Sequence, residues 1–226
     1  MIAVFFLLSY NKITIIKKRN SLCFYCLSGY KNNENVKIMT ILFVSGSTRK
    51  GSFNTKLVKY SYNYAISIGL ESKLIDLADY EVLIYQGDWE KENGVPQDVK
   101  KLKELFFNSK GFFISTPEYN GFFSPLLMNT IDWLSRPETE GEASLKVFRN
   151  KVAMIAAASP GKLGGIRALP HLRLFLNNVG VNVLPNEMGI PFAMKNFDDD
   201  GNLLDEGLKK MLCNNIDRFK DFIAEV

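Results

Sequence analysis

The chain has 226 residues, of which 46% are hydrophobic and 23% are charged, a composition that excludes an intrinsically disordered protein. Its formal net charge of +4 resides in residues 1–38, which hold six basic side chains against one acidic, a net of +5. The remaining 188 residues hold 22 basic and 23 acidic side chains, a net of −1. We therefore expect no nucleic-acid partner.

Residues 1–38 form an N-terminal extension that we predict to lie outside the fold. The apolar run Ile2–Leu8 is much shorter than the roughly 20 residues of a transmembrane helix, and no secretory cleavage pattern follows it. We therefore expect no stable membrane anchor, although a weak membrane-surface anchor is the alternative. Met39 directly precedes the first predicted strand and is the expected natural start.

The three cysteines favour a reducing cytoplasm over a disulfide-bonded protein. Cys23 and Cys26 have the C-x-x-C spacing of a redox or zinc motif, but no second Cys/His pair lies near them, and His171 is the single histidine of the chain. A structural zinc site takes four ligands. We therefore expect no metal site.

From Thr40 onward, apolar runs alternate with amphipathic segments, which is the pattern of a parallel sheet with helices on both faces. The predicted strands are Thr40–Ser45, Ser72–Leu77, Gly111–Thr116, Lys151–Ala158 and Val181–Leu184. The predicted helices are Asn54–Ile68, Gln97–Asn108, a segment after Ser124-Pro125, Gly165–Asn178 and Leu204–Ile223, with a turn-rich connection over Ala78–Val95.

This pattern predicts one α/β domain over residues 39–226, a flavodoxin-like three-layer sandwich with a five-stranded parallel sheet of order 2-1-3-4-5. In such a sheet, ligands bind at the carboxyl ends of the strands beside the switch point. The first, third and fourth strands all lead into loops at that edge, so these three loops are the candidate site.

The first loop, Gly46–Asn54, joins a strand to the start of a helix through hydroxyl-bearing residues. Backbone N–H groups and the helix dipole favour an anion there, and Arg49 adds a planar cation suited to phosphate. The loop has the glycine spacing of a P-loop without its Lys-[Ser/Thr], and Thr48 replaces the middle glycine of the dinucleotide fingerprint. The loop favours a flavin mononucleotide phosphate, and an ordinary polar turn is the alternative.

The second and third loops are Thr116–Gly121 and Ser159–Gly165. Pro117, Tyr119 and Gly121 favour a turn that lies along a flat ring with free backbone N–H groups. The three glycines of the third loop let the backbone approach a ligand closely. A surface turn and a glycine-rich connection without chemistry are the alternatives.

These motifs, together with Asn129–Pro137 and the extension of the third loop to Arg167, resemble the NADPH-dependent FMN reductase family over about residues 40–190. That family has a flavodoxin-like fold and includes azoreductases, quinone reductases and chromate reductases. The resemblance implies an oxidoreductase that passes a hydride from NADPH or NADH through bound FMN to a small acceptor, such as a quinone, an azo compound, chromate or a flavin. It also implies a homodimer or homotetramer.

The resemblance further implies which residues contact FMN. The first loop would contribute Ser47, Arg49, Ser52, Phe53, Asn54 and Thr55, with Ser47, Arg49, Ser52 and Asn54 on the phosphate. The ribityl chain and ring would contact Pro117, Glu118, Tyr119, Asn120 and Gly121, with Ser159, Gly161 and Gly164 from the third loop. No catalytic side chain is expected, because the flavin carries the redox chemistry. The 2′-phosphate of NADPH could meet Arg136, Lys162 or Arg167.

Two other functions stay open at this point. One is a flavodoxin-type electron carrier without a nicotinamide site, and the other is a non-catalytic module that retains FMN or only the fold. Flavodoxins tend to be strongly acidic, whereas residues 39–226 are nearly neutral. This balance of charge favours the enzyme.

Overall fold

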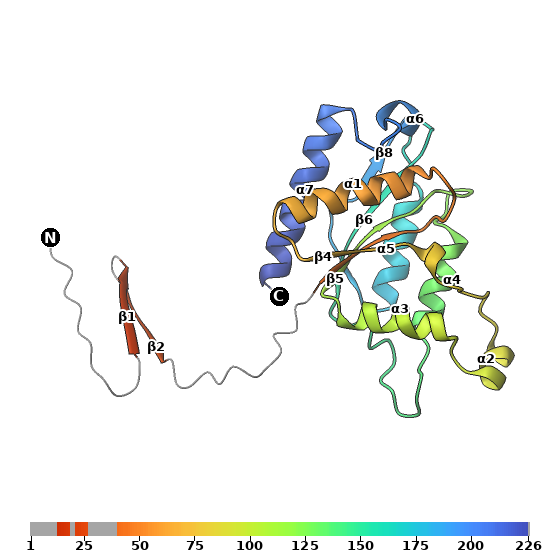
Figure 1. The fold of residues 1–226 in the computed structure, drawn as a ribbon, viewed down its shortest axis with the longest axis horizontal. Helices are drawn as coiled ribbons and strands as arrows, with labels where there is room; N and C mark the ends of the chain where they lie inside the picture. Colours follow the sequence, from red (N-terminus) through yellow and green to blue (C-terminus); the bar gives the residue numbers. More distant parts are fainter. Residues whose placement is uncertain (1–12, 19–20, 27–39, 226) are drawn as a thin grey trace. The chain divides into compact units, whose positions relative to one another are not determined.

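The computed structural model describes residues 13–18, 21–26 and 40–225, which fall into two units described separately here (Figure 1). In the first unit, β1 (Ile13–Lys18) pairs antiparallel with β2 (Ser21–Cys26). The apolar run Ile2–Leu8 and Met39 lie outside the described residues, so the start at Met39 stays a prediction. Within the described part of the chain, no group of three or more His, Cys, Asp or Glu side chains could hold a metal ion.

The second unit contains a parallel sheet of order β4-β3-β5-β6-β7, with β8 also paired to β6. Its strands are β3 (Ile41–Ser45), β4 (Ser72–Ile75), β5 (Gly111–Ser115), β6 (Val152–Ala158), β7 (Asn182–Val183) and β8 (Met188–Ile190). For the five predicted strands this is the order 2-1-3-4-5. The predicted flavodoxin-like sheet is therefore confirmed.

Helices cover both faces of the sheet, with α1 and α7 on one side and α3, α4 and α5 on the other (Figure 1). The helices are α1 (Phe53–Ser67), α2 (Gly87–Asn93), α3 (Gln97–Asn108), α4 (Pro125–Leu134), α5 (Ala168–Asn178), α6 (Ala193–Asn196) and α7 (Glu206–Glu225). In the described residues, every helix is too short or too polar to cross a membrane.

Two hydrophobic cores follow from the alternation of side chains along each strand. On β3, Leu42 and Val44 pack with the α3, α4 and α5 side, whereas Ile41 and Phe43 pack with the α1 and α7 side. The ring of Phe43 stacks on that of Phe113 with centroids 5.1 Å apart. The central strands β3, β5 and β6 are thus fully buried, whereas the outer strands β4 and β7 are partly exposed.

The fifth strand differs from its predicted extent, Val181–Leu184. β7 is short and pairs with the beginning of β6, and β8, which no sequence pattern indicated, pairs with the end of β6. Pro185 interrupts the run because it has no N–H to donate to the sheet. Arg173 of α5 binds the carbonyl oxygens of Val183 and Leu184 at 2.8 and 2.7 Å, which stabilises the break.

Three helices also differ from their predicted extents. α2 lies inside the predicted turn-rich connection, where the side chain of Gln86 accepts a hydrogen bond from the Trp89 N–H and caps the helix. α5 begins at Ala168 and α7 at Glu206, each a few residues later than predicted. These shifts leave the three candidate loops at the carboxyl edge of the sheet.

Candidate functional site

Hydrogen bonds connect the start of the first loop to the residues on either side of the second loop. The Gly46 N–H donates to the Ser115 carbonyl at 2.7 Å, and the Ser124 hydroxyl donates to the Gly46 carbonyl at 2.6 Å. Ser124 also caps α4, as its sequence context predicts, by accepting from the Leu127 N–H at 3.3 Å. One buried serine thus fixes both the start of α4 and the beginning of the first loop.

Asn54, at the end of the first loop, binds the ends of the two strands that lead into the second and third loops. Its Oδ1 accepts from the Ser115 hydroxyl at 2.8 Å and from the Ala158 N–H at 2.9 Å, and its Nδ2 donates to the Ala158 carbonyl at 3.1 Å. The residue is only 3% exposed. Three of the four hydrogen bonds that an amide side chain can make are thus used inside the protein. The predicted phosphate contact of Asn54 stays a prediction, and its backbone N–H is the group best suited to make it.

The N-terminus of α1 lacks a side-chain cap. Ser52 is the N-cap residue, but its hydroxyl makes no cap hydrogen bond, and the first turn contains no acidic residue. The first N–H groups of a helix have no partner within the helix. They are therefore available to an anion at this end of α1.

Each of the other two helices that follow these strands has a side-chain acceptor at its start, although the residue that precedes α5 does not cap it with its own side chain. α4 is capped by Ser124, and at the start of α5 the Arg167 N–H donates to the Glu118 carboxylate at 3.2 Å. Among α1, α4 and α5, only α1 thus begins without a side-chain partner. The residues present therefore fit a single phosphate group at α1.

Hydroxyl groups and one cation surround this end of α1. Ser47 is buried, and its hydroxyl accepts from the Arg49 N–H at 3.4 Å. The exposed Arg49 guanidinium donates to the Lys50 carbonyl at 3.2 Å and forms no ion pair within the described residues. Thr55 bonds to the Ser47 carbonyl at 3.2 Å and to the Ser45 hydroxyl at 3.0 Å. Ser45 was not among the predicted site residues. A serine at the end of an apolar strand is the sequence pattern that could have indicated it.

The second loop folds back on itself as a two-residue turn. Tyr119 and Phe122 exchange two backbone hydrogen bonds of 2.9 and 3.0 Å, and the φ values of Asn120 and Gly121 between them are 54° and 83°. Two positive φ values in an Asn-Gly pair are typical of a type I′ hairpin turn. Phe122 stacks on the exposed His171 of α5, with ring centroids 4.6 Å apart. We name residues 119–122 the hairpin.

The third loop packs closely against β8. A Cβ atom at Gly164 would lie 2.7 Å from both the Ile190 carbonyl carbon and the Pro191 nitrogen, so only glycine fits there. The Phe192 N–H donates to the Gly161 carbonyl at 3.1 Å, and Phe192 itself has a φ of 46°. The missing side chain of Gly164 is thus required by packing, and the predicted cofactor contacts of Gly161 and Gly164 stay predictions.

Phe53, Pro117 and Ser159 are the remaining predicted site residues, and the Pro117 carbonyl accepts from the Thr116 hydroxyl at 3.1 Å. The Phe53 ring packs toward Phe197, with centroids 6.3 Å apart. The Ser159 hydroxyl accepts from the Gly161 N–H at 3.2 Å, and its carbonyl accepts from the Ala193 N–H at 3.0 Å. Phe53 and Ser159 therefore support the loops that we predicted to hold the cofactor.

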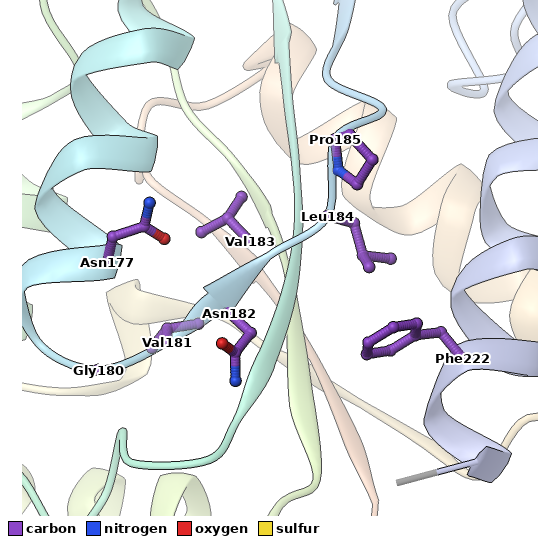
Figure 2. A pocket seen from close by; sticks show the side chains of 8 residues that line it. All are labelled: Asn177, Gly180, Val181, Asn182, Val183, Leu184, Pro185 and Phe222. Carbon is purple, nitrogen blue, oxygen red and sulfur yellow. The ribbon is translucent and has the colours of Figure 1, made fainter.

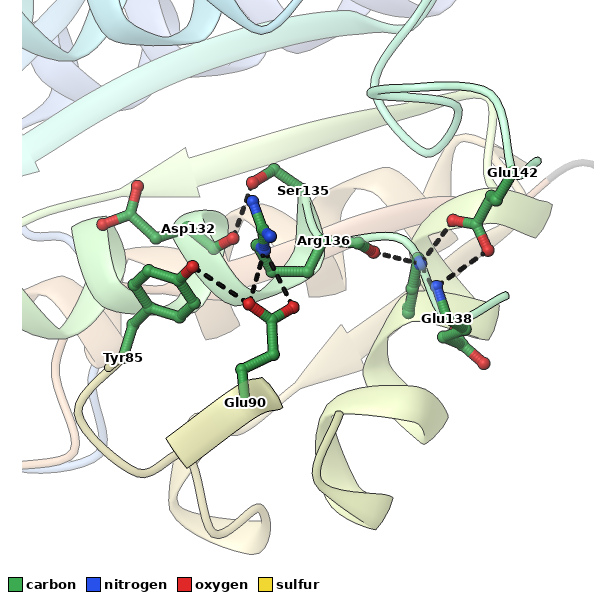
Figure 3. A network of polar contacts seen from close by, with 8 residues as sticks. Tyr85, Glu90, Asp132, Ser135, Arg136, Glu138 and Glu142 are labelled. Atoms are coloured by element: carbon green, nitrogen blue, oxygen red, sulfur yellow. Dashed lines mark hydrogen bonds and ion pairs between the residues drawn. The ribbon is translucent and has the colours of Figure 1, made fainter. Parts of the chain in front are cut away.

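Two of the three cations suggested for a 2′-phosphate are already paired. Arg136 donates from Nε to both carboxylate oxygens of Glu90, at 2.8 and 2.9 Å, and Glu90 also accepts from the Tyr85 hydroxyl (Figure 3). Arg167 pairs with Glu118. Lys162 is exposed and forms no ion pair with any described residue. By elimination, Lys162 is the available cation of the three.

A hollow of about 520 Å³ lies along the edge strand β7, away from the three loops (Figure 2). It is lined by Asn177, Gly180, Val181, Asn182, Val183, Leu184, Pro185 and Phe222. None of these described residues is charged, and none belongs to a candidate loop. We place the site at the loops because the uncapped helix end and the hydroxyl groups lie there.

The doubly wound sheet and the uncapped end of α1 make this an α/β protein whose residues at the carboxyl edge of the sheet fit a phosphate group. The profile of the NADPH-dependent FMN reductase family matches residues 39–195, which is more than half of the chain. The chain therefore belongs to the NADPH-dependent FMN reductase family.

Individual relatives agree with this assignment. A quinone reductase of Escherichia coli (strain K12) is 32% identical over 197 residues, which cover 86% of this chain and 98% of the relative. An NAD(P)H-dependent FMN reductase of Pseudomonas aeruginosa is 32% identical over 76% of this chain and 88% of its own length. The structure of the flavoenzyme FerB, an NAD(P)H:(acceptor) oxidoreductase from Paracoccus denitrificans, superposes with a TM-score of 0.71 at 30% identity, covering 83% of this chain and 98% of FerB.

The predicted class of protein is thus confirmed. The chain is an FMN-dependent oxidoreductase that takes its electrons from NAD(P)H.

Proposed function

We propose that this protein transfers a hydride from NADPH or NADH, by way of FMN bound at the three loops, to a small planar acceptor of quinone or azo type. The uncapped N-terminus of α1, close to Arg49, is the observation that supports this location for FMN. Bound FMN supplies the redox chemistry. The protein binds it, orients it and limits the access of water.

The first loop provides the groups that suit a phosphate. Ser47, Arg49 and Ser52 are proposed to bind it, with the backbone N–H groups of Phe53, Asn54 and Thr55. A phosphate there gains charge-assisted hydrogen bonds and a favourable interaction with the helix dipole. The hairpin, with Pro117 and Glu118 before it, and the third loop, with Ser159, Gly161 and Gly164, are proposed to border the ribityl chain and the ring.

Exposed apolar side chains around the second and third loops support a flat, apolar acceptor. Tyr119, Leu163, Ile166 and Phe192 are each about half-exposed. Such side chains favour aromatic rings over a hydrophilic anion such as chromate. The names of two relatives are consistent with this choice, since one is a quinone reductase and another, from Bacillus, is an NADPH azoreductase.

Stopped-flow mixing of the FMN-loaded protein with NADPH or NADH under anaerobic conditions tests the function. We expect rapid loss of the yellow colour, followed by its return when a quinone or an azo dye is added, and a slower return with chromate or free flavin. A flavin that stays oxidised for minutes would instead identify an electron carrier. Protein that takes up no FMN would identify a non-catalytic module.

We also propose a homodimer or homotetramer in the cytoplasm. Assembly would cover part of the exposed apolar surface near the third loop and α5. This surface includes Ile166, which directly precedes α5, and Leu174 of α5. A reducing compartment agrees with Cys213, whose thiol is free in the described part of the chain. Analytical ultracentrifugation tests the assembly, and fractionation of cells that express the native gene tests the location.

A further inference from the structure

Glu118 is held by three contacts to one residue on the neighbouring loop. Its Oε1 accepts from Arg167 Nε at 2.7 Å and also pairs with Nη2, and its Oε2 accepts from the Arg167 N–H at 3.2 Å. The Glu118 side chain is 8% exposed, whereas that of Arg167 is 64% exposed. A sheltered carboxylate is thus covered by an arginine that solvent reaches.

The pair joins the second loop to the third. Glu118 directly precedes the hairpin, and Arg167 is the N-cap residue of α5. The two loops approach closely here, since a Cβ atom at Gly165 would lie 3.8 Å from the Glu118 Cβ. The hairpin's own backbone bonds are internal, and the Phe122–His171 stack is a further contact between the hairpin and α5.

This geometry gives Glu118 a positioning role. An ionised carboxylate only accepts hydrogen bonds, and both of its oxygens are occupied by Arg167. The carboxylate also lies at the positive end of α5, where a negative charge is favoured. Arg167 thus makes three contacts with this one carboxylate, which suits Glu118 to holding the second loop against the start of α5.

We propose that Glu118 and Arg167 form a latch that holds the hairpin against the start of α5 and thereby slows the release of FMN. The latch rests on the proposed location of FMN at the three loops. When it is closed, the hairpin and the third loop keep a fixed separation, which preorganises the walls of the ring site. When it is broken, the hairpin moves away from α5 more often, and the flavin escapes faster.

The test compares the FMN-loaded parent with Arg167→Ala, Glu118→Gln and the double variant. Dissociation is followed by the rise of free-flavin fluorescence after dilution. Opening of the latch is followed by amide hydrogen exchange at position 167, whose N–H donates to Glu118 across the two loops. Each single change is expected to raise the dissociation rate about five- to tenfold, as for a charge-assisted pair at a surface. The double variant is expected to match the single variants, because either change alone opens the latch.

Lys209→Ala is the matched control, since it breaks the exposed Lys209–Glu206 pair of 2.6 Å at the start of α7. It should leave both readouts unchanged. Parental dissociation rates in both single variants would overturn the latch, and so would a double variant equal to the product of the two single effects. Arg49→Ala separates the proposed FMN site from the proposed latch. If Arg49→Ala releases FMN and the latch variants do not, the site is correct and the latch is wrong. If none of these variants releases FMN, the site itself is misplaced.

Discussion

Asn54 and Ala158 hold each other through two hydrogen bonds, one in each direction, between the first turn of α1 and the end of β6. The same Asn54 oxygen also accepts from Ser115 at the end of β5. One amide side chain therefore sets the position of the α1 N-terminus relative to two strand ends. Because the loops begin at these ends, Asn54 determines how the parts of the site are spaced.

Asn54→Ala is expected to lower the free energy of unfolding by about 2–4 kcal/mol, because buried Ser115 and Ala158 groups lose their partners at about 1–3 kcal/mol each. Asn63→Ala, at an exposed position of the same helix, is the control and should change stability little. Urea unfolding of the FMN-free proteins measures both. Equal decreases in the free energy of unfolding in the two variants would show that the side-chain hydrogen bonds of Asn54 do not stabilise the protein.

Arg49→Ala is expected to weaken FMN binding about 10- to 100-fold, because a charge-assisted hydrogen bond to the phosphate contributes about 1.5–3 kcal/mol. The thermal unfolding of the FMN-free protein should be unchanged, since the Arg49 side chain is exposed and donates one hydrogen bond, to the carbonyl of its neighbour. Fluorescence titration with FMN measures the affinity. Lys50→Ala removes the adjacent exposed charge and serves as the control; if both variants bind FMN like the parent, the phosphate lies elsewhere.

Lys162→Ala is expected to raise the KM for NADPH several-fold and to leave that for NADH unchanged. Of the three cations considered for the 2′-phosphate, Arg136 and Arg167 are paired with carboxylates and Lys162 is not. Steady-state kinetics with both nicotinamides give the comparison, and Lys91→Ala, on exposed α2, is the control. An equal change in both KM values would assign Lys162 to a general role and not to the 2′-phosphate.

Glu142→Gln is expected to destabilise the protein in a pH-dependent way. Burial raises the pKa of Glu142, but hydrogen bonds from Lys103, the Glu138 N–H and Lys146 together outweigh burial and hold the pKa below its ordinary value. Figure 3 shows Glu142 beside Glu138. Lys103 is itself buried and bonds to Glu142 at 2.5 Å. Removing the charge leaves that lysine poorly paired, at a cost of about 2 kcal/mol or more.

The lowered pKa of Glu142 determines how its contribution to the free energy of unfolding changes with pH. Near its pKa, Glu142 binds fewer protons in the folded than in the unfolded protein, so its contribution is complete above the ordinary value of 4.5 and is lost as the pH falls through the folded value. Urea unfolding at pH 7 and at successively lower pH should therefore show a difference between parent and variant that closes with acid. Glu140→Gln, at an exposed position of the same loop, should show no such trend.

The sheet order and the edge that bears the site are predictable from the sequence. Each strand is a short apolar run, each is followed by a helix, and parallel connections of this kind permit few topologies. Loop one is predictable as an anion site because Gly46–Asn54 combines small, hydroxyl-bearing and basic residues at a strand–helix junction. Such patterns lie within short segments of the sequence, so they can be recognised without knowing how the segments pack.

Contacts between distant residues are not predictable in this way. Asn54 and Ala158 lie 104 positions apart, and Glu118 and Arg167 lie 49 apart. Nothing near Asn54 indicates that its amide is used inside the protein, and nothing near Arg167 indicates that it is paired. The division of the fifth strand likewise depends on Arg173, which reaches it from α5. These features become visible only when the elements are packed.

The carboxylate at the start of α5 also bears on which flavin nucleotide the protein selects. A diphosphate gains most from two favourable helix ends, but here Glu118 already neutralises one of them, and Ser124 closes the end of α4. FAD therefore gains nothing at these loops from its second phosphate and must still place its adenosine outside them. We therefore expect FMN to bind more tightly than FAD, and a competition titration of FMN against FAD, repeated with Glu118→Gln, measures how much of that preference depends on Glu118.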